Sequence, residues 1–337
     1  MAMASLAGDA LPALTVEPLL PGSALPLLVS PQVVSSQPAG VSLGAFADEL
    51  QGLVARHLYE HGGLLFRGFA VASVDDFRAF AAAFGHALLT SDFGSTPRSR
   101  VSDGVYSSTE YPAHQSIPLH NEQAYSREWP MKIWFYCAQP SSTGGETPIA
   151  DSREVYTRIP ASIRQRWVER GLMYVRNFGG GLDVPWPQVF NTSDRAEVER
   201  YCREHGISCE WKPDGELRTR QVCQVVAQHP HTRQSVWFNQ AHLFHVSALE
   251  EEVREVLLDA VAPEDLPRNV YHADGSELPA EDLAAIRAAL EECRRVFPWQ
   301  GGDVLMLDNM LAAHARNPFS GPRKVVVAMA ESHGAQR

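Results

Sequence analysis

Apolar residues recur at helical spacing near the start of the chain and form short continuous runs further on. After Ser42 they form one stripe of a predicted helix that ends at Gly62 and Gly63. The stripe consists of Leu43, Phe46, Leu50, Leu53, Val54 and Leu58. A second helix is expected after Ser73, where Asp76 completes an arrangement that resembles a capping box. Residues 64–66, between the two helices, predict a short buried strand.

The rest of the chain mixes strand and helix patterns without a repeat. An apolar run at 133–138 predicts a strand, because Pro140 and a turn-rich segment end it. Further strands are expected at 235–239, 303–307 and 323–330, and a hairpin across 213–215. Helical patterns occupy 152–170, 193–205, 248–261 and 280–296.

These elements predict a mainly β fold with helical insertions. Strands lie on both sides of a long insertion around 152–300, and no regular alternation of strand and helix suggests a Rossmann sheet. A β-sandwich or jelly roll is therefore expected. Residues 1–41 are rich in Pro, Ala, Leu and Ser and predict an extended N-terminal lead-in across the domain surface, whereas 42–337 predict a single domain.

Charge and cysteine content exclude several classes of protein. The 29 basic and 40 acidic residues give a net charge of −11, and no run of Lys or Arg is present, so a nucleic-acid partner is not expected. No apolar run is long enough to span a membrane. The five cysteines are odd in number and lack C-x-x-C spacing, which disfavours disulfides and thiolate zinc sites. With no basic signal-peptide start, a cytoplasmic protein is expected.

Candidate metal chemistry begins at His120 and Glu122. If this segment is extended, side chains two residues apart share a face, so the imidazole and the carboxylate can hold one metal ion. A third ligand must come from elsewhere in the chain. Two histidines and one carboxylate on one face of an octahedron suit iron(II) oxygen chemistry. A pair of surface residues without a metal is the alternative interpretation of this spacing.

The third ligand is predicted to be His314, which follows the apolar run 303–307. The segment 315–322 has turn chemistry, and an antiparallel return across it would set Arg323 beside His314. An arginine that opens an apolar strand needs a partner if it is buried, and a bidentate carboxylate is the best one. A diacid that chelates iron through its 2-oxo-acid end would place its far carboxylate there. The alternative is a solvated strand end.

Five ordered motifs resemble the taurine/2,4-D dioxygenase (TauD/TfdA) family, and the resemblance covers roughly residues 42–332. They are Ser107-Ser108-Thr109-Glu110-Tyr111-Pro112, Ser116-Ile117-Pro118-Leu119-His120-Asn121-Glu122, Gly144-Gly145-Glu146-Thr147-Pro148 with Ala150-Asp151, Trp237-Phe238-Asn239-Gln240, and Asp308-Asn309 with His314. The resemblance implies a double-stranded β-helix core of the jelly-roll or cupin-like type. It also implies Fe(II) on His120, Glu122 and His314, 2-oxoglutarate on Thr147 and Arg323, and O₂ as co-substrate.

The most similar branch is that of the syringomycin-type amino acid hydroxylases of natural-product pathways. It implies hydroxylation of an unactivated C–H bond in an amino-acid-like substrate, free or tethered to a peptidyl carrier protein. Candidate substrate contacts are Ser116, Asn239, His245 and Arg316. The carboxylate is Glu122 rather than the Asp of the best-known members, and Arg323 follows His314 by nine positions, closer than in the taurine enzyme. Related halogenases carry Gly or Ala at the carboxylate position, so Glu122 argues against halogenation.

Alternatives remain at this point. Desaturation or an oxidative cyclisation would use the same residues. A non-catalytic cupin-like binding protein, or a zinc hydrolase on the same ligands, belongs to a different class. Only the oxygenase should convert 2-oxoglutarate to succinate. Two further histidine pairs, His229 with His231 and His242 with His245, are weaker metal candidates because neither has an acidic partner nearby in the sequence.

Overall fold

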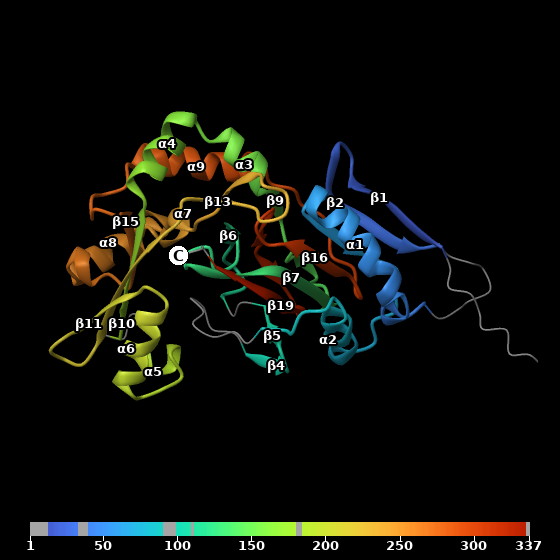
Figure 1. Cartoon of the computed structure of the whole chain (residues 1–337), viewed down its shortest axis with the longest axis horizontal. Coiled ribbons are helices and arrows are strands. Elements are labelled where there is room, and N and C mark those ends of the chain that lie inside the picture. The colour runs from blue at the N-terminus through green and yellow to red at the C-terminus, as the bar shows by residue number, and fades with distance from the viewer. Residues whose placement is uncertain (1–12, 33–39, 90–98, 109–110, 180–183, 335–337) are drawn as a thin grey trace, which may run out of the picture.

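The computed structural model describes residues 13–32, 40–89, 99–108, 111–179 and 184–334. The first 12 residues of the predicted lead-in, its residues 33–39, and Thr109 and Glu110 of the first motif lie outside these ranges. The described chain forms a large sheet faced by a smaller one, with a long insertion at one end (Figure 1). The predicted jelly-roll core with helical insertions is confirmed.

The main sheet has eight strands and is mostly antiparallel. Its order is β1 (Leu14–Leu20), β2 (Ser23–Pro31), β3 (Gly63–Phe66), β16 (Val304–Asp308), β7 (Glu128–Gln139), β19 (Lys324–Gly334), β5 (Val105–Ser107) and β4 (Arg100–Ser102). The smaller sheet has the order β6 (Ile117–His120), β17 (Ala312–Arg316) and β9 (Ile149–Asp151). A short two-stranded pair is formed by β8 (Thr143–Gly144), which precedes β9 in the chain, and β18 (Phe319–Ser320), which follows β17. A hydrophobic core that includes Phe135, Ile149, Leu305, Ala312 and Val327 joins strands of the two sheets.

Both helices predicted near the N-terminus form and cover the other face of the main sheet. Helix α1 (Ala47–His61) ends at Gly62, whose φ of 82° is the left-handed conformation that favours glycine. Helix α2 (Val74–Ala82) begins at Ser73, whose Oγ accepts a hydrogen bond of 3.1 Å from the Asp76 N–H. Phe77 of α2 stacks on Tyr136 of β7. Local capping chemistry and apolar spacing were therefore sufficient to predict these elements.

Part of the segment predicted to be an extended lead-in is instead built into the main sheet. Strands β1 and β2 form an antiparallel hairpin, and β2 runs parallel to β3. Leu25, Leu27 and Val29 are buried there. The prolines in this segment hide the strand pattern in the sequence, but hydrogen bonds to β3 and burial of these three side chains hold the hairpin on the sheet.

The insertion contains a four-stranded sheet of its own in addition to its helices. The strands are β11 (Ser208–Trp211), β12 (Leu217–Cys223), β10 (Leu172–Phe178) and β15 (Arg268–His272), in that order. The hairpin predicted across 213–215 joins β11 and β12. The helices are α3 (Ser152–Arg158), α4 (Ala161–Arg170), α5 (Trp186–Val189), α6 (Arg195–Glu204), α7 (Ala241–Phe244), α8 (Glu251–Ala260) and α9 (Ala280–Glu292). A two-stranded ribbon, β13 (Val226–Gln228) with β14 (Ser235–Trp237), returns the chain to the core. The prediction of a helical insertion therefore missed this four-stranded sheet.

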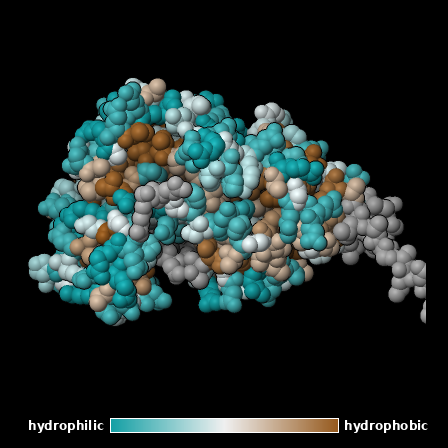
Figure 2. Space-filling view, in the orientation of Figure 1, coloured by the Kyte–Doolittle hydropathy of each residue, from teal (hydrophilic) through white to brown (hydrophobic). Residues whose placement is uncertain are grey.

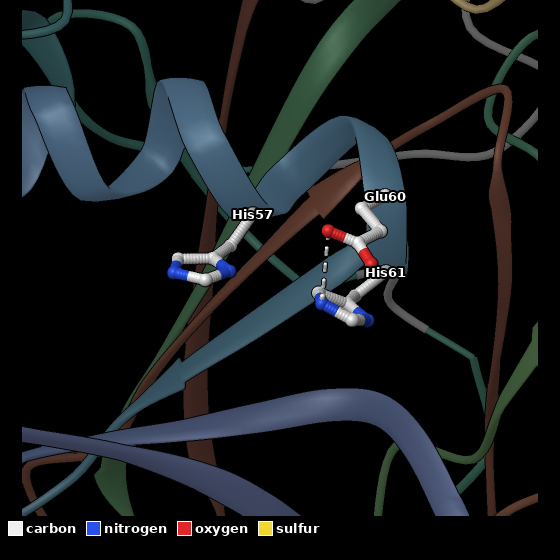
Figure 3. A group of neighbouring side chains, drawn as sticks. All are labelled: His57, Glu60 and His61. Carbon is white, nitrogen blue, oxygen red and sulfur yellow. Dashed lines mark ion pairs between the residues drawn. The ribbon is translucent and has the colours of Figure 1, made fainter.

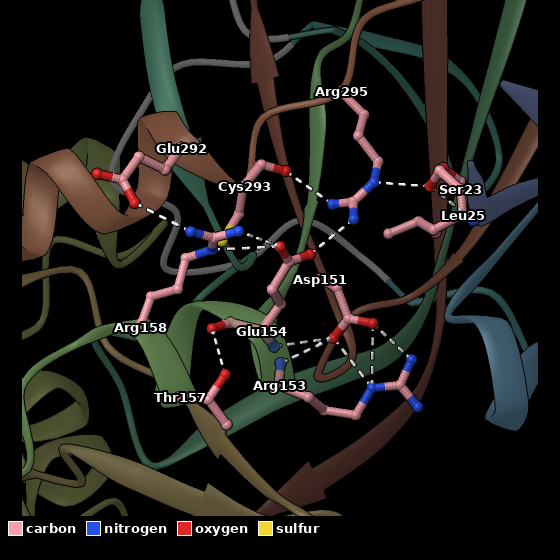
Figure 4. Close-up of polar contacts among 10 residues, drawn as sticks. All are labelled: Ser23, Leu25, Asp151, Arg153, Glu154, Thr157, Arg158, Glu292, Cys293 and Arg295. Atoms are coloured by element: carbon pink, nitrogen blue, oxygen red, sulfur yellow. Dashed lines mark hydrogen bonds and ion pairs between the residues drawn. The ribbon is translucent and has the colours of Figure 1, made fainter. Parts of the chain in front are cut away.

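An ionic network joins the insertion to the sheets at the start of α3 (Figure 4). Glu154 pairs with both Arg158 and Arg295, and these two guanidinium groups hold the pKa of Glu154 below its ordinary value against the opposing effect of burial. Arg295 also donates to Ser23 of β2 at 2.7 Å, and its backbone bonds to Ile149 of β9. Because β9 pairs with β17, this network supports a strand that carries a candidate metal ligand.

The surface is mostly hydrophilic in the view of Figure 2, with apolar side chains gathered in separate patches. The most exposed of the large apolar side chains is Val256 of α8, at 71%. Val253 and Leu258 of the same helix, and Leu249 just before it, are also exposed, so part of the apolar surface is gathered at α8. Among the described residues, no helix combines the length and the apolar character needed to cross a bilayer.

Candidate metal centre

His120, Glu122 and His314 converge at the end of the smaller sheet. One potential ligand atom of each lies within 4.8 Å of the other two. The pairing of β6 with β17 sets His120 directly opposite His314, and their ring centroids are 4.5 Å apart. The Glu122 Oε2 lies 3.7 Å from the His314 Nε2. This donor set of two imidazoles and one carboxylate fits an octahedral iron(II) ion with an open face.

The backbone conformation between His120 and Glu122 differs from the predicted continuous strand. Strand β6 ends at His120, and Glu122 lies in the turn that follows, just before Gln123 with its positive φ of 56°. The shared face of a continuous strand therefore does not account for the meeting of the two side chains. The turn itself must be held in place, and buried side chains do this.

Asn309 holds the peptide groups on both sides of Glu122. Its Oδ1 accepts from the Glu122 N–H at 2.7 Å, and its Nδ2 donates to the Glu122 carbonyl at 2.9 Å. The same Nδ2 donates to the Pro130 carbonyl at 2.8 Å, and the residue is fully buried. The Asn309 amide thus satisfies both the N–H and the carbonyl of Glu122, as the backbone of a paired strand would do.

Two residues from the segment around α7 satisfy the adjacent carbonyls. The Gln240 Nε2 donates to the Asn121 carbonyl at 2.7 Å, and the His242 Nε2 donates to the Leu119 carbonyl at 2.7 Å. Burial lowers the pKa of His242 to about 4, so the ring is neutral at pH 7 with its proton on Nε2. The backbone from 119 to 122 is therefore fixed by groups distant in sequence, and none of them was predicted to have this role.

The His120 tautomer suits a metal ligand. Its Nδ1 lies 2.8 Å from the Pro118 carbonyl, which can only accept, so Nδ1 carries the proton. The lone pair then resides on Nε2, the nitrogen through which a metal would be bound. A backbone carbonyl that fixes the tautomer in this way is a recurring feature of histidine ligands.

His229 contacts the turn that contains Asn309 indirectly, through Asp308. Its Nδ1 accepts from the backbone N–H groups of His231 and Thr232, so the proton on Nε2 is donated to Asp308 Oδ2 at 2.9 Å. The other Asp308 oxygen accepts from the N–H groups of Met310 and Leu311. Asp308 thereby shapes the turn that contains Asn309.

Replacing Asn309 by Ala should weaken iron binding without unfolding the protein. The substitution removes both hydrogen bonds to Glu122, and losing an outer partner of a metal ligand typically costs about 10–100-fold in affinity or activity. Asn177→Ala is the matched control, because Asn177 is a buried amide that bridges the Glu264 and Leu266 carbonyls in the insertion. Iron titration of both folded variants is the measurement. Equal iron affinities in the two variants would show that Asn309 does not position Glu122.

Arg323 does not reach its position by the predicted route. Strand β17 pairs with β6 and β9, whereas β19, which follows Arg323, pairs with β7 and β5. The prediction that β19 returns antiparallel to β17 is therefore wrong. The segment 317–323, which contains β18, carries the chain from the smaller sheet to the main sheet instead, because β17 and β19 pair with different strands.

The environment of Arg323 suits a carboxylate ligand. Its guanidinium donates to the Gly145 carbonyl at 3.0 Å and the Ser108 Oγ at 3.2 Å, both uncharged groups. Burial, reinforced by the charge of Arg316, lowers the pKa of Arg323 to about 10. Among the described residues no carboxylate forms an ion pair with it. A partly buried cation with neutral partners and a like charge nearby is stabilised when an anion binds.

Thr147 lies on the same loop, two residues after Gly145. It is buried, and its Oγ1 accepts from the Trp299 Nε1 at 3.1 Å. The hydroxyl still has its own hydrogen to donate to a ligand. Arg323 and Thr147 are thus connected through the segment 145–147, which fits the prediction that they serve one ligand.

The four candidate substrate contacts differ in their surroundings. Ser116 is exposed just before β6. The Asn239 amide bonds the Val225 carbonyl and the Ala241 N–H, and Arg316 donates to the carbonyls of Tyr111, Pro112 and Gln115. Asn239 and Arg316 therefore have roles within the fold. The His245 Nδ1 accepts from the Ser247 N–H at 3.1 Å, and burial lowers the pKa of His245 to about 4.

The other histidine pairs are used by the fold. In the part of the chain that the structure describes, neither His229 with His231 nor His242 with His245 belongs to a cluster of three potential metal ligands. His229 is bonded to Asp308 and His242 to Leu119. A second cluster does exist at the end of α1 and was not predicted.

Comparison with known proteins finds a family whose profile covers most of the chain. The profile of the taurine catabolism dioxygenase TauD, TfdA family matches residues 20–329. The dapdiamide synthesis protein DdaC of Enterobacter agglomerans is 44% identical over 81% of this chain and 83% of its own length. A clavaminate synthase-like protein of Arabidopsis thaliana is 35% identical over 90% of this chain and 93% of its own length.

Solved structures show the same fold at low sequence identity. PvcB of Pseudomonas aeruginosa superposes with a TM-score of 0.52 at 17% identity, covering 94% of this chain and 91% of its own. A 2,4-D dioxygenase homologue of Burkholderia xenovorans gives 0.53 at 15% identity, covering 94% and 97%. The predicted family is confirmed: the chain belongs to the taurine catabolism dioxygenase TauD, TfdA family of Fe(II)- and 2-oxoglutarate-dependent dioxygenases.

Proposed function

We propose that this enzyme hydroxylates an unactivated C–H bond of a small amino-acid-like substrate in the biosynthesis of a natural product. The observation that carries the proposal is the convergence of His120, Glu122 and His314 within 4.8 Å. The name of the 44% identical relative, a dapdiamide synthesis protein, supports the pathway class. The five cysteines are all free thiols in described parts of the chain, which supports a cytoplasmic location.

The proposed ligand set divides the work among this chain's own residues. His120, Glu122 and His314 would hold iron(II), while Arg323 and Thr147 would bind the far carboxylate of 2-oxoglutarate. When bound, these cofactors supply the oxidising chemistry, in which O₂ is consumed, 2-oxoglutarate yields succinate and CO₂, and one oxygen atom enters the substrate. The buried strands around the site keep water away and fix which C–H bond is presented. Ser116 and His245 are the proposed substrate contacts, since Ser116 is exposed just before β6 and the His245 ring bonds the Ser247 N–H through Nδ1 and not through Nε2.

Hydroxylation is favoured over halogenation because of Glu122. The Glu122 carboxylate would fill the coordination position that chloride needs, so the enzyme should add oxygen even in saturating chloride. Desaturation and oxidative cyclisation use the same residues, and product mass distinguishes them from hydroxylation by the absence of an added oxygen atom.

The test is a screen of amino acids, free and loaded on a peptidyl carrier protein, for succinate release that depends on the substrate. Mass spectrometry of the product formed in saturating chloride then identifies the reaction. A gain of one oxygen atom per succinate is expected. A chlorinated main product would rule out the hydroxylase assignment, and a loss of two hydrogen atoms would assign desaturation or cyclisation.

A further inference from the structure

A second group of side chains that could hold a metal ion lies at the C-terminal end of α1, before the first of the family motifs in the sequence. His57, Glu60 and His61 each offer a ligand atom within 4.8 Å of the others (Figure 3). The two histidines are four residues apart and therefore lie one above the other on one face of the helix. Their rings are nearly parallel, with centroids 5.8 Å apart.

The spacing His57-Leu58-Tyr59-Glu60-His61 has a known chemical meaning. Two histidines at i and i+4 with an adjacent glutamate, H-x-x-E-H, occur on the metal-binding helix of one class of zinc enzymes. The match alone is weak, since it involves three residues. Here the structure supplies the context that the motif requires, a helix with both imidazoles and the carboxylate on neighbouring positions of its last turn.

The three side chains are within reach of a single ion. Donor atoms about 2.0–2.2 Å from a zinc ion are roughly 3–4 Å from one another. The Glu60 Oε2 already lies 3.6 Å from the His61 Nε2, and the His57 Nδ1 takes part in no hydrogen bond with a described residue. Glu60 is largely exposed, so its side chain can rotate toward an ion without disturbing the core.

The charge environment also favours a cation. The C-terminal end of a helix carries a partial negative charge that stabilises a bound cation. Arg153 approaches the Glu60 carbonyl, but the Asp151 carboxylate pairs with its guanidinium and compensates its charge.

We propose that His57, Glu60 and His61 form a second metal site, specific for a divalent transition ion such as zinc and separate from the iron centre. Water would complete the coordination, because the site faces solvent. The site lies close to the iron-binding segment in the hydrogen-bond network: the carbonyl of Gly62, directly after His61, accepts from the N–H of Asp308, next to Asn309. Occupancy should therefore stabilise the end of α1 and the turn it contacts.

The test counts zinc ions by equilibrium dialysis of the metal-free full chain. His57→Ala and His61→Ala should each bind one zinc ion fewer than the wild type. The control is His86→Ala, because His86 also forms a surface pair with a glutamate, Glu331, but has no second histidine. It should bind as much zinc as the wild type.

Repeating the count in His314→Ala separates the two sites. That variant should retain the α1 ion, and His57→Ala/His314→Ala should lose it. Zinc should also raise the Tm of the wild type more than that of His57→Ala, because an ion that binds the folded state stabilises it. Equal zinc counts in the wild type, His57→Ala and His61→Ala would overturn the proposal, whatever the state of the iron centre.

Discussion

Alanine at His120, Glu122 or His314 should abolish iron binding and turnover while the protein stays folded. Each substitution removes one of three protein ligands, so the loss should exceed the roughly 10–100-fold that removal of an outer partner of a ligand costs. Glu122→Gln should be equally inactive, because it keeps the shape of the side chain and removes the charge. Iron content after anaerobic loading and succinate formation are the two measurements.

The control for these variants is His231→Ala. His231 is an exposed histidine that stacks on Tyr59, outside the ligand cluster, so its removal should leave iron content and succinate formation near the wild-type values. Thermal unfolding of each metal-free variant checks that the fold persists. Full activity in any one of the three ligand variants would remove that residue from the ligand set.

Replacing Arg323 by Gln should raise the KM for 2-oxoglutarate at least about 30-fold. A buried charged pair that loses one partner typically costs about 2–5 kcal/mol, and each 1.4 kcal/mol corresponds to roughly a factor of ten. Arg323→Lys should recover part of the loss, because it restores the charge without the two-pronged geometry of the guanidinium. Steady-state kinetics with 2-oxoglutarate as the varied substrate is the measurement.

Arg316 provides the comparison for Arg323. Both guanidinium groups lie over the Phe319 ring, at 5.3 and 5.4 Å from its centroid, but Arg316 donates to three backbone carbonyls of residues 111–115. Arg316→Gln should therefore lower stability more than it changes the KM for 2-oxoglutarate. If Arg316→Gln raises this KM and Arg323→Gln does not, the cofactor carboxylate binds to the other arginine.

The sequence was sufficient where structure depends on neighbouring residues. The stripe of α1, its end at Gly62, the Ser73 cap of α2 and the apolar strand β7 all follow from local spacing and capping chemistry. The three candidate ligands could be named from residue type and from the family resemblance. None of these predictions required knowledge of which strands pair.

The sequence alone did not predict which strands distant in sequence pair with one another. Turn residues at 315–322 predicted that β19 would return along β17, but each strand pairs with strands distant in sequence. The hairpin of β1 and β2 was missed for the same reason, since its proline-containing strand β2 pairs with β3, which is distant in sequence. The sheet in the insertion likewise consists of short strands that the helical patterns around them obscured.

The residues that fix the ligand segment were missed although two of them lie in recognised motifs. Gln240 and Asn309 look like ordinary polar residues in the sequence, and their role becomes visible only when the turn after His120 is seen to have no strand beside it. A polar amide next to a predicted ligand motif, in a segment otherwise apolar, is the signal that could have indicated them.

The most direct test of the metal and cofactor assignment is an anaerobic crystal structure with iron(II) and 2-oxoglutarate, with iron located by anomalous scattering. Iron is expected between His120, Glu122 and His314, with the far carboxylate of 2-oxoglutarate at Arg323 and Thr147. Iron held by any other set of residues, or a 2-oxoglutarate carboxylate bound at Arg316 instead of Arg323, would contradict the assignment.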